Sequence, residues 1–273
     1  MSDEFSPWLN RHSTASEAIT PRLLAQFRAT LAENLADTEV PPGLHWCLLP
    51  DLPAPADLGR DGHARPGIFV PELPLPRRMW AGGEVQFLAP LHHGDMVTRD
   101  QHFSDIMRKT GTTGPLVFLT QRSTWSVGCR VCISERRDYV YRPEAKPGQT
   151  PVPRMAEPWP MAQGFDITPD PVLLFRYSAM TFNGHRIHYD QPYATAVEGY
   201  DGLVVHGPLQ AIWLMNLAAR ILCAPPRQFR YRGLAPLICG LTVRAEARQM
   251  PDGLALRVRK SDGEVTLEAQ ASP

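Results

Sequence analysis

Four long strand-like runs in the first half of the chain place the strongest constraint on its fold. Turns that contain Gly or Asp separate these runs from one another. The runs cover residues 83–91, 95–109, 115–127 and 129–142. Strands of this length do not suit a sandwich built from short pieces, so we predict an extended antiparallel sheet.

The second half of the chain repeats this plan, with helical segments before its strands. Residues 204–224 are apolar nearly all round, which predicts a helix buried on most sides. Residues 168–181 predict an earlier helix that Thr168 caps. The expected apolar face of that earlier helix consists of Val172, Leu173, Phe175 and Met180. Strand-like runs follow at residues 237–250, 253–261 and 264–272.

A helix is also expected near the start of the chain, over residues 20–34. Thr20 can cap this helix, and Pro21 suits its first turn. Its apolar stripe consists of Leu23, Leu24, Phe27 and Leu31. A sheet that curls round one hydrophobic helix buries both elements in a single core. We therefore expect an α+β protein of two halves, each a long antiparallel sheet wrapped round a central helix.

Proline-rich segments divide the chain. They cover residues 49–78 and 142–160, and both should be irregular because proline fixes φ and lacks an amide donor. The second segment lies near the middle of the chain, between the two similar patterns. We therefore predict two domains, residues 1–150 and 151–273.

The composition excludes several classes of protein. The 28 basic residues balance 28 acidic ones, so nothing draws the whole chain to nucleic acid or to an anionic membrane. Apolar runs are too short to predict a membrane span, and the N-terminus does not resemble a secretory signal. The five scattered cysteines indicate reduced thiols in the cytoplasm. Cys129 and Cys132 lie in a strand-like run without a second metal-binding pair, so we interpret them as structural.

The segment 176–194 gathers polar residues that could carry chemistry. His185 and His188 lie three residues apart, Asn183 precedes them and Asp190 follows. From residue types alone, an acid/base centre, a metal site and an inert polar loop all remain open. Histidine suits proton transfer because both of its forms are accessible near neutral pH. A metal site is not expected, because neither an HExxH pattern nor a cysteine partner accompanies the pair.

The segment 175–190, followed by residues 201–209 and a buried helix, resembles the MaoC-like, or type 2, enoyl-CoA hydratases. The segments 76–97, 109–125 and 229–237 resemble the two-domain FAS1-type dehydratases of that family, among which the itaconyl-CoA and mesaconyl-C4-CoA hydratases are the most similar. The mitochondrial 3-hydroxyacyl-thioester dehydratases are also similar. The resemblance implies a double hot-dog fold, with a supporting first half and the hydratase loop in the second half.

The resemblance also implies the site residues. His188 matches the catalytic histidine of the family, and Asn183 stands where the family has its catalytic aspartate, five residues earlier. An amide cannot take a proton at neutral pH, but it can hold a water molecule. Asp190 matches the second aspartate of the motif, either to orient His188 or to cap a turn. The amide of Gly207, where the buried helix begins, is the expected donor to the thioester oxygen.

The implied reaction adds water to itaconyl-CoA or mesaconyl-C4-CoA to form citramalyl-CoA. The free carboxylate of such a substrate needs a cation, for which Arg232 and Arg186 are the first candidates. No cofactor is expected, because CoA is part of the substrate. We also expect a cytoplasmic homo-oligomer that binds neither nucleic acid nor membranes.

Three other functions remain open at this stage. One is a dehydratase that acts on straight-chain 3-hydroxyacyl thioesters of CoA or acyl carrier protein. Another is a hot-dog thioesterase, which would use a carboxylate as its nucleophile or base. The third is a non-catalytic module that binds acyl thioesters, which the change from aspartate to Asn183 suggests.

Overall fold

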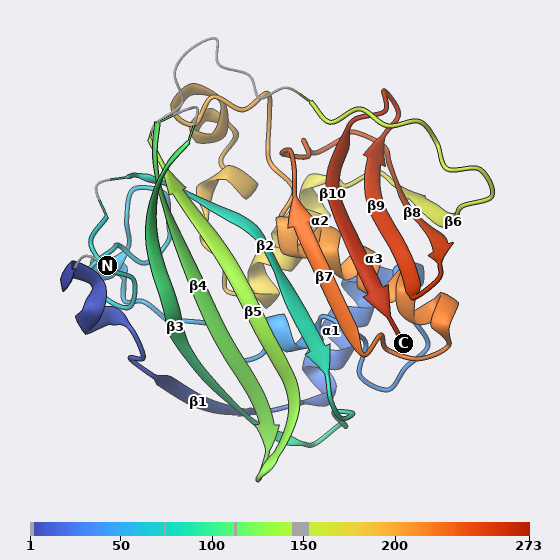
Figure 1. Cartoon of the computed structure of the whole chain (residues 1–273), viewed down its shortest axis with the longest axis horizontal. Helices are drawn as coiled ribbons and strands as arrows, with labels where there is room; N and C mark the ends of the chain where they lie inside the picture. The colour runs from blue at the N-terminus through green and yellow to red at the C-terminus, as the bar shows by residue number, and fades with distance from the viewer. Residues whose placement is uncertain (1–2, 74, 112–113, 144–152) are drawn as a thin grey trace.

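Ten strands form one continuous antiparallel sheet in the computed structural model (Figure 1). The structure describes residues 3–73, 75–111, 114–143 and 153–273, so the predicted domain boundary at residue 150 lies outside the described residues. The strands are β1 (Ser13–Ala18), β2 (Arg77–Phe87), β3 (Met96–Gly111), β4 (Gly114–Val127), β5 (Arg130–Arg142), β6 (Gln163–Ile167), β7 (Gln228–Gly233), β8 (Val243–Met250), β9 (Gly253–Lys260) and β10 (Val265–Ser272). Their order is β1-β3-β4-β5-β2-β7-β10-β9-β8-β6, and the predicted long antiparallel strands are confirmed.

The two halves of the sheet meet where β2 pairs with β7. Figure 1 shows these two strands side by side at the middle of the sheet, and their register joins Gly83 to Tyr231. The backbones approach closely here: a Cβ at Gly82 would lie 2.6 Å from the carbonyl oxygen of Tyr231. Only glycine fits this position, so the seam between the halves is fixed by backbone contact.

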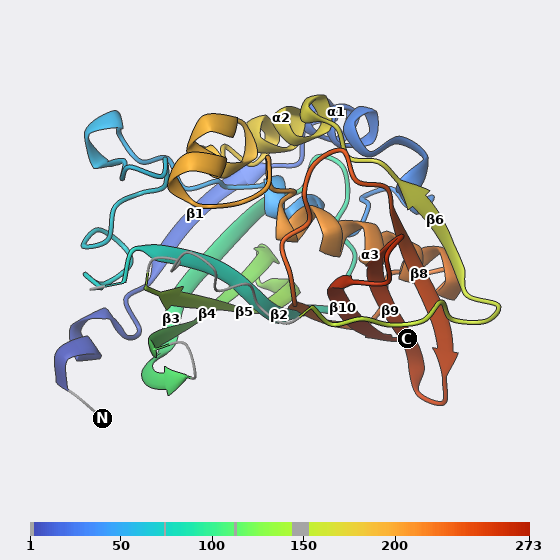
Figure 2. The ribbon, with the colours of Figure 1, turned by 90° about the horizontal axis from the view of Figure 1, so that it is seen from above.

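The predicted buried helix is α3 (Gly207–Leu222), which packs against β7, β8, β9 and β10. Figure 2 shows α3 between the sheet and two outer helices, α1 (Pro21–Leu31) and α2 (Pro171–Met180). The central residues of α3 have almost no exposed surface, and Trp213 is among the largest side chains that are fully buried. This helix is the centre of the main hydrophobic core.

The first half lacks a comparable long central helix among its described residues. Its sheet instead covers a short 3₁₀ turn, Leu44–Cys47, whose His45 ring packs against Trp125. Gly43 precedes this turn with a left-handed φ of 95°, so Pro41 and Pro42 lie outside it. Asn216 of α3 donates to the carbonyl of Pro42 at 2.9 Å, which ties the turn to the second half.

The caps of the outer helices test two predictions. Thr20 caps α1 as expected, since its hydroxyl accepts from the amide of Leu23. The prediction for Thr168 is wrong, because the carboxylate of Asp170 accepts from the amide of Leu173 at 2.7 Å and the helix begins at Pro171.

The predicted apolar face of α2 is also wrong in part. Leu173 and Met180 pack against the core as expected, but Leu174 and Tyr177 are the fully buried residues of the helix. Val172 and Phe175 are 56% and 66% exposed. The exposed residues lie on the side of α2 that is turned away from this core, and α2 packs beside α1.

Three strands escaped prediction, namely β1, β6 and β7. They are five or six residues long, and β1 consists of Ser, Thr, Ala and Glu without an apolar alternation. Cys132 is buried and Cys129 is exposed beside β5, as expected for a strand rather than a metal site. Across the described part of the chain, every helix is too short or too polar to cross a membrane.

Candidate active site

The loop between α2 and α3 brings His188 to the N-terminus of α3. His188 is only 7% exposed, and its Nδ1 lies 2.6 Å from the carbonyl oxygen of Val204. Because a carbonyl oxygen can only accept, Nδ1 carries the proton and Nε2 is left with a free lone pair. The backbone also holds the loop in place, since the amide of Val204 donates to the carbonyl of Ile187 at 2.9 Å.

Burial keeps the imidazole of His188 neutral. It lowers the pKa of His188 to about 3, although the hydrogen bond to Val204 acts in the opposite direction. The ring is therefore unprotonated near neutral pH, with Nε2 available as a base.

His206 joins His188 to the start of α3. The two imidazole rings are stacked, with centroids 3.5 Å apart and an angle of 19° between their planes. Nε2 of His206 lies 2.8 Å from the hydroxyl of Ser178, which fixes the ring. His206 is the residue immediately before Gly207, so the stack places the imidazole of His188 beside the first turn of the helix.

Gly207 is required by the packing of Trp80. A Cβ at position 207 would lie 2.5 Å from the indole ring of Trp80, which itself stacks on Tyr231 with centroids 4.5 Å apart. The start of α3 therefore presents bare backbone, as its predicted role of donating an amide requires.

Asn183 shapes the loop that carries the histidines. Its Oδ1 accepts from the amide of His185 at 3.0 Å, and its own amide donates to the carbonyl of Ser178 at 2.9 Å. This Asx turn occupies one of the two lone pairs of Oδ1. The second lone pair and the Nδ2 protons remain for the water molecule that Asn183 is predicted to hold.

The structure does not bring Asp190 to His188. One of its carboxylate oxygens accepts from the guanidinium of Arg186 at 2.7 and 3.0 Å, and the other accepts from the amide of Tyr193. Of the two roles expected for Asp190, capping the following turn fits these contacts. The carbonyl of Val204 is the group that orients His188.

The two arginines predicted to bind substrate lie in different surroundings. Arg186 is occupied by Asp190 and by the ring of Tyr193, which lies 4.1 Å from its guanidinium carbon. Arg232 is exposed on the face of β7 opposite to Tyr231, which is buried beside α3. The structure therefore does not bring Arg232 to the histidines.

Arg78 of β2 is the guanidinium that lies near the histidines. It is partly exposed and packs over the ring of Tyr139 at 4.2 Å. The nearby side chains of Tyr141, Tyr139 and Asp51 raise its pKa against the effect of burial, and among the described residues no carboxylate lies within ion-pair distance of it. Its positive charge acts on His63 and His185, and it adds to the lowering of their pKa values that burial causes.

Sequence reasoning missed Asp61 and His63, which lie in the first proline-rich segment. Nδ1 of His63 lies 3.1 Å from the carboxylate of Asp61, and its ring lies 4.2 Å from that of His185. His185 in turn meets His188 edge-on at 5.3 Å, so four histidines form a row that ends at His206. In the sequence, the only signal was an Asp-Gly-His triplet within an irregular segment.

Asp61, His63 and His185 each offer one polar atom that could bind a shared ligand. These atoms lie within 4.8 Å of one another, which allows a single water molecule or cation to reach all three. The alternative metal set of His185, His188 and Asp190 is not assembled, because Asp190 is bound to Arg186.

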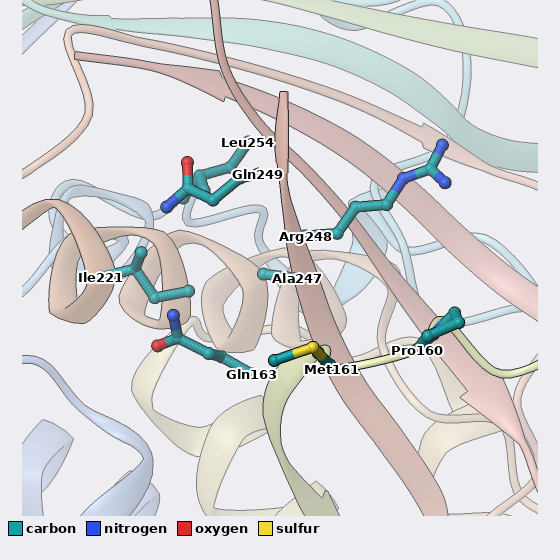
Figure 3. Close-up of a pocket in the computed structure, with 8 residues that line it drawn as sticks. All are labelled: Pro160, Met161, Gln163, Ile221, Ala247, Arg248, Gln249 and Leu254. Atoms are coloured by element: carbon teal, nitrogen blue, oxygen red, sulfur yellow. The ribbon is translucent and has the colours of Figure 1, made fainter. Parts of the chain in front are cut away.

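A separate pocket lies at the other end of α3 (Figure 3). Its volume is about 380 Å³, and residues around it include Ile221 of α3, Gln163 of β6 and Arg248 of β8. His206 precedes the first turn of α3, while Ile221 is in the last, and a helix of 16 residues is roughly 24 Å long. This pocket is therefore remote from the histidine row.

The chain belongs to the hydroxyacyl-thioester dehydratase type 2 family, whose model matches residues 43–239. The match spans both halves and includes all four histidines of the row.

Two curated relatives resemble the chain over most of its length. A mesaconyl-C(4)-CoA hydratase of Chloroflexus aurantiacus is 39% identical over 273 residues, covering 98% of this chain and 97% of the relative. A mitochondrial hydroxyacyl-thioester dehydratase type 2 of Saccharomyces cerevisiae is 29% identical, covering 84% of this chain and 82% of the relative.

Solved structures share the fold at low sequence identity. HtdX of Mycobacterium tuberculosis superposes with a TM-score of 0.67 at 18% identity, covering 95% of this chain and 98% of the other. A conserved Mycobacterium tuberculosis protein described as a double hot-dog fold superposes with a TM-score of 0.54 at 16% identity, covering 98% and 97%. The predicted double hot-dog fold is confirmed.

Proposed function

We propose that the protein is a hydro-lyase that adds water to the double bond of a short dicarboxylic enoyl-CoA, either mesaconyl-C4-CoA or itaconyl-CoA, to give citramalyl-CoA. The observation that carries this proposal is the buried, neutral imidazole of His188 beside the start of α3. The 39% identity with a mesaconyl-C(4)-CoA hydratase over nearly the whole chain supports the substrate class.

The reaction needs a base, a proton donor and a site for negative charge. In the proposed sequence for mesaconyl-C4-CoA, whose double bond is conjugated with the thioester, Nε2 of His188 takes a proton from water while the water oxygen bonds to the β-carbon. The electron pair of the double bond moves toward the thioester, whose oxygen gains negative charge. The protonated imidazole then returns its proton to the α-carbon, which restores the thioester carbonyl and neutral His188.

The backbone at the start of α3 is proposed to stabilise the charged oxygen. The amide of Gly207 has no intrahelical partner, and the helix dipole favours negative charge there. One preorganised donor of this kind typically lowers a barrier by about 3 kcal/mol. Asn183 is proposed to hold the attacking water.

Arg78 is proposed to bind the free carboxylate of the substrate in place of Arg232 and Arg186. It is the arginine near the row whose guanidinium meets an aromatic ring and no carboxylate among the described residues. A guanidinium binds a carboxylate with two parallel hydrogen bonds, so a diacid substrate would complete its coordination.

A dehydratase acting on straight-chain 3-hydroxyacyl thioesters is the second candidate. The family match and the 29% identity with the yeast dehydratase favour it. The two candidates share the acid/base chemistry and differ in the acyl group.

A panel of CoA esters distinguishes the candidates. Hydration of mesaconyl-C4-CoA and crotonyl-CoA is followed at the enoyl-thioester absorbance, and hydration of itaconyl-CoA is followed by chromatographic detection of citramalyl-CoA. Free thiol is measured in parallel. Hydration of the diacids with a kcat/KM well above that of crotonyl-CoA is expected. Turnover of crotonyl-CoA alone would favour the straight-chain enzyme, thiol release a thioesterase, and binding without turnover a non-catalytic module.

The remaining properties follow from this chemistry as proposals. Proton transfer and charge stabilisation by side chains and backbone require no cofactor besides the CoA of the substrate. We also propose a cytoplasmic homo-oligomer, for which the exposed Val172 and Phe175 on α2 offer apolar surface. Analytical ultracentrifugation of the wild type and of Phe175→Glu would test the oligomer.

A further inference from the structure

The loop of residues 59–63 is built onto the histidine loop. The amide of Arg186 donates to the carbonyl of Asp61 at 2.9 Å, and the Arg186 guanidinium donates to the carbonyl of Arg60. Gly62 has a positive φ of 86°, and a Cβ there would lie 2.0 Å from the carbonyl oxygen of Gly184. Because the two backbones touch, the positions of Asp61 and His63 are fixed relative to the histidine loop.

Asp61 and His63 form an oriented pair that points at His185. The carboxylate of Asp61 accepts from the backbone amide of His63 and lies 3.1 Å from its Nδ1. A carboxylate can only accept here, so His63 carries its proton on Nδ1 and has a free Nε2. The pair is partly buried and contacts His185 through the ring of His63 at 4.2 Å.

The pair of Asp61 and His63 supplies a carboxylate, which the histidine loop lacks in free form. Position 183 carries an amide whose Oδ1 already closes the Asx turn with the amide of His185, so the loop has no ionised side chain free for a water molecule. Asp190 is neutralised by Arg186. Asp61 brings a carboxylate to the row from a loop in the first half of the chain.

We propose that Asp61 and His63 are positioning residues of the hydratase site, which hold, together with His185, the water molecule that His188 deprotonates. The three polar atoms of Asp61, His63 and His185 converge closely enough for one oxygen to reach them all, and His185 contacts His188 directly. This inference rests on the proposed function. It gives the first half a direct part in the reaction, beyond support of the pocket.

Replacement of the carboxylate by an amide of the same shape tests the proposal. In Asp61→Asn and His63→Gln, kcat is expected to fall on the order of 100-fold, with KM changed by less than about threefold and an unchanged melting temperature. Asp57→Asn is the matched control, because Asp57 lies four residues before Asp61, and its half-exposed carboxylate forms an ion pair with Arg65. Its kcat should stay within about twofold of wild type.

A relocated carboxylate gives a second readout that a purely structural role would not move. Asn183→Asp in the Asp61→Asn background is expected to recover at least about tenfold of the lost kcat, because a carboxylate again faces the water. Wild-type kcat in Asp61→Asn and His63→Gln would overturn the proposal, and so would a loss that merely parallels a lowered melting temperature. If the wild type hydrates crotonyl-CoA but no diacid, the proposed substrate fails, while the same variants still test this inference with crotonyl-CoA.

Discussion

The Nδ1 proton of His188 is held by the backbone carbonyl of Val204 at 2.6 Å, a contact across 16 residues of sequence. His188 can act as a base through Nε2 only in the tautomer that has its proton on Nδ1. The acceptor that fixes this tautomer is a main-chain carbonyl, so no side-chain substitution can remove it. The same contact brings the base to the segment that leads into α3, so orientation of the base and placement of the helix amide have one structural origin.

Replacing His188 should abolish turnover. His188→Gln is expected to lower kcat by about 10²–10⁴-fold, because His188 is the residue proposed to take the proton from the water, whereas His63 and His185 are proposed only to hold that water. Steady-state hydration assays measure the effect, and circular dichroism checks the fold. His93→Gln is the control, since His93 is exposed in the turn between β2 and β3. Wild-type kcat in His188→Gln would remove His188 from the mechanism.

The substitutions at Asn183 should differ from each other. Asn183→Asp keeps an oxygen that can accept from the amide of His185, whereas Asn183→Ala loses the turn. We therefore expect Asn183→Asp to retain more kcat than Asn183→Ala, by about tenfold. Equal rates in the two variants would show that neither the turn nor the bound water depends on this side chain.

An added methyl group at Gly207 should disturb both stability and activity. Its Cβ would meet the indole of Trp80, which is held by Tyr231, so we expect a loss of about 1–3 kcal/mol in unfolding free energy. The kcat should also fall because the helix start moves away from the substrate oxygen. Trp80→Leu should reduce the stability cost of Gly207→Ala in a double-mutant cycle. Additive costs would show that the ring does not restrict this position.

Arg78 should matter more for diacids than for monoacids. Arg78→Ala is expected to raise KM for mesaconyl-C4-CoA by about 100-fold and to change KM for crotonyl-CoA far less, because crotonyl-CoA has no free carboxylate. Arg232→Ala should leave both values unchanged, since Arg232 is exposed on the opposite face of the sheet. Equal effects of Arg78→Ala on the two esters would contradict the assignment.

Buried histidines should make the protein sensitive to acid. Burial lowers the pKa of His188 and of His45 to about 3, so the unfolded chain takes up protons between this value and about 6.5 while the folded chain does not. Stability is therefore complete above about pH 6.5 and declines as pH falls. One such group loses about 2 kcal/mol near pH 5, by the equivalence of pKa and free energy.

Urea unfolding across this pH range measures the decline. His188→Gln and His45→Gln should each flatten the dependence of unfolding free energy on pH, because each removes one group that protonates only in the unfolded chain. A slope equal to that of the wild type in both variants would show that these rings are not buried in their neutral form.

The long strands and the helix α3 could be predicted because their patterns are strong over many residues. In contrast, α2 has an apolar residue on most sides, so its composition did not reveal that Leu174 and Tyr177 face inward. The short strand β1 has no apolar alternation, and it forms because the long edge of β3 offers it a partner. Contacts with distant parts of the chain determine the orientation of α2 and the formation of β1, and the local sequence pattern does not reveal such contacts.

The candidate site also contains residues that the sequence identified and residues that it did not. The loop of His185 and His188 is continuous in sequence, so its residues could be identified together. Asp61 and His63 lie more than 120 residues earlier in an irregular segment, and tertiary contacts such as that between Gly62 and Gly184 join them to the loop. The placement of Arg232 depended on which face of β7 turns inward, which the strand pattern alone left open.

The pairing of β2 with β7 limits how sequences of related proteins can be recombined. A slip of one residue along that ladder would turn Tyr231 outward and Arg232 inward, and it would carry Trp80 away from Gly207. Recombination between relatives should therefore succeed only when both strands come from the same parent.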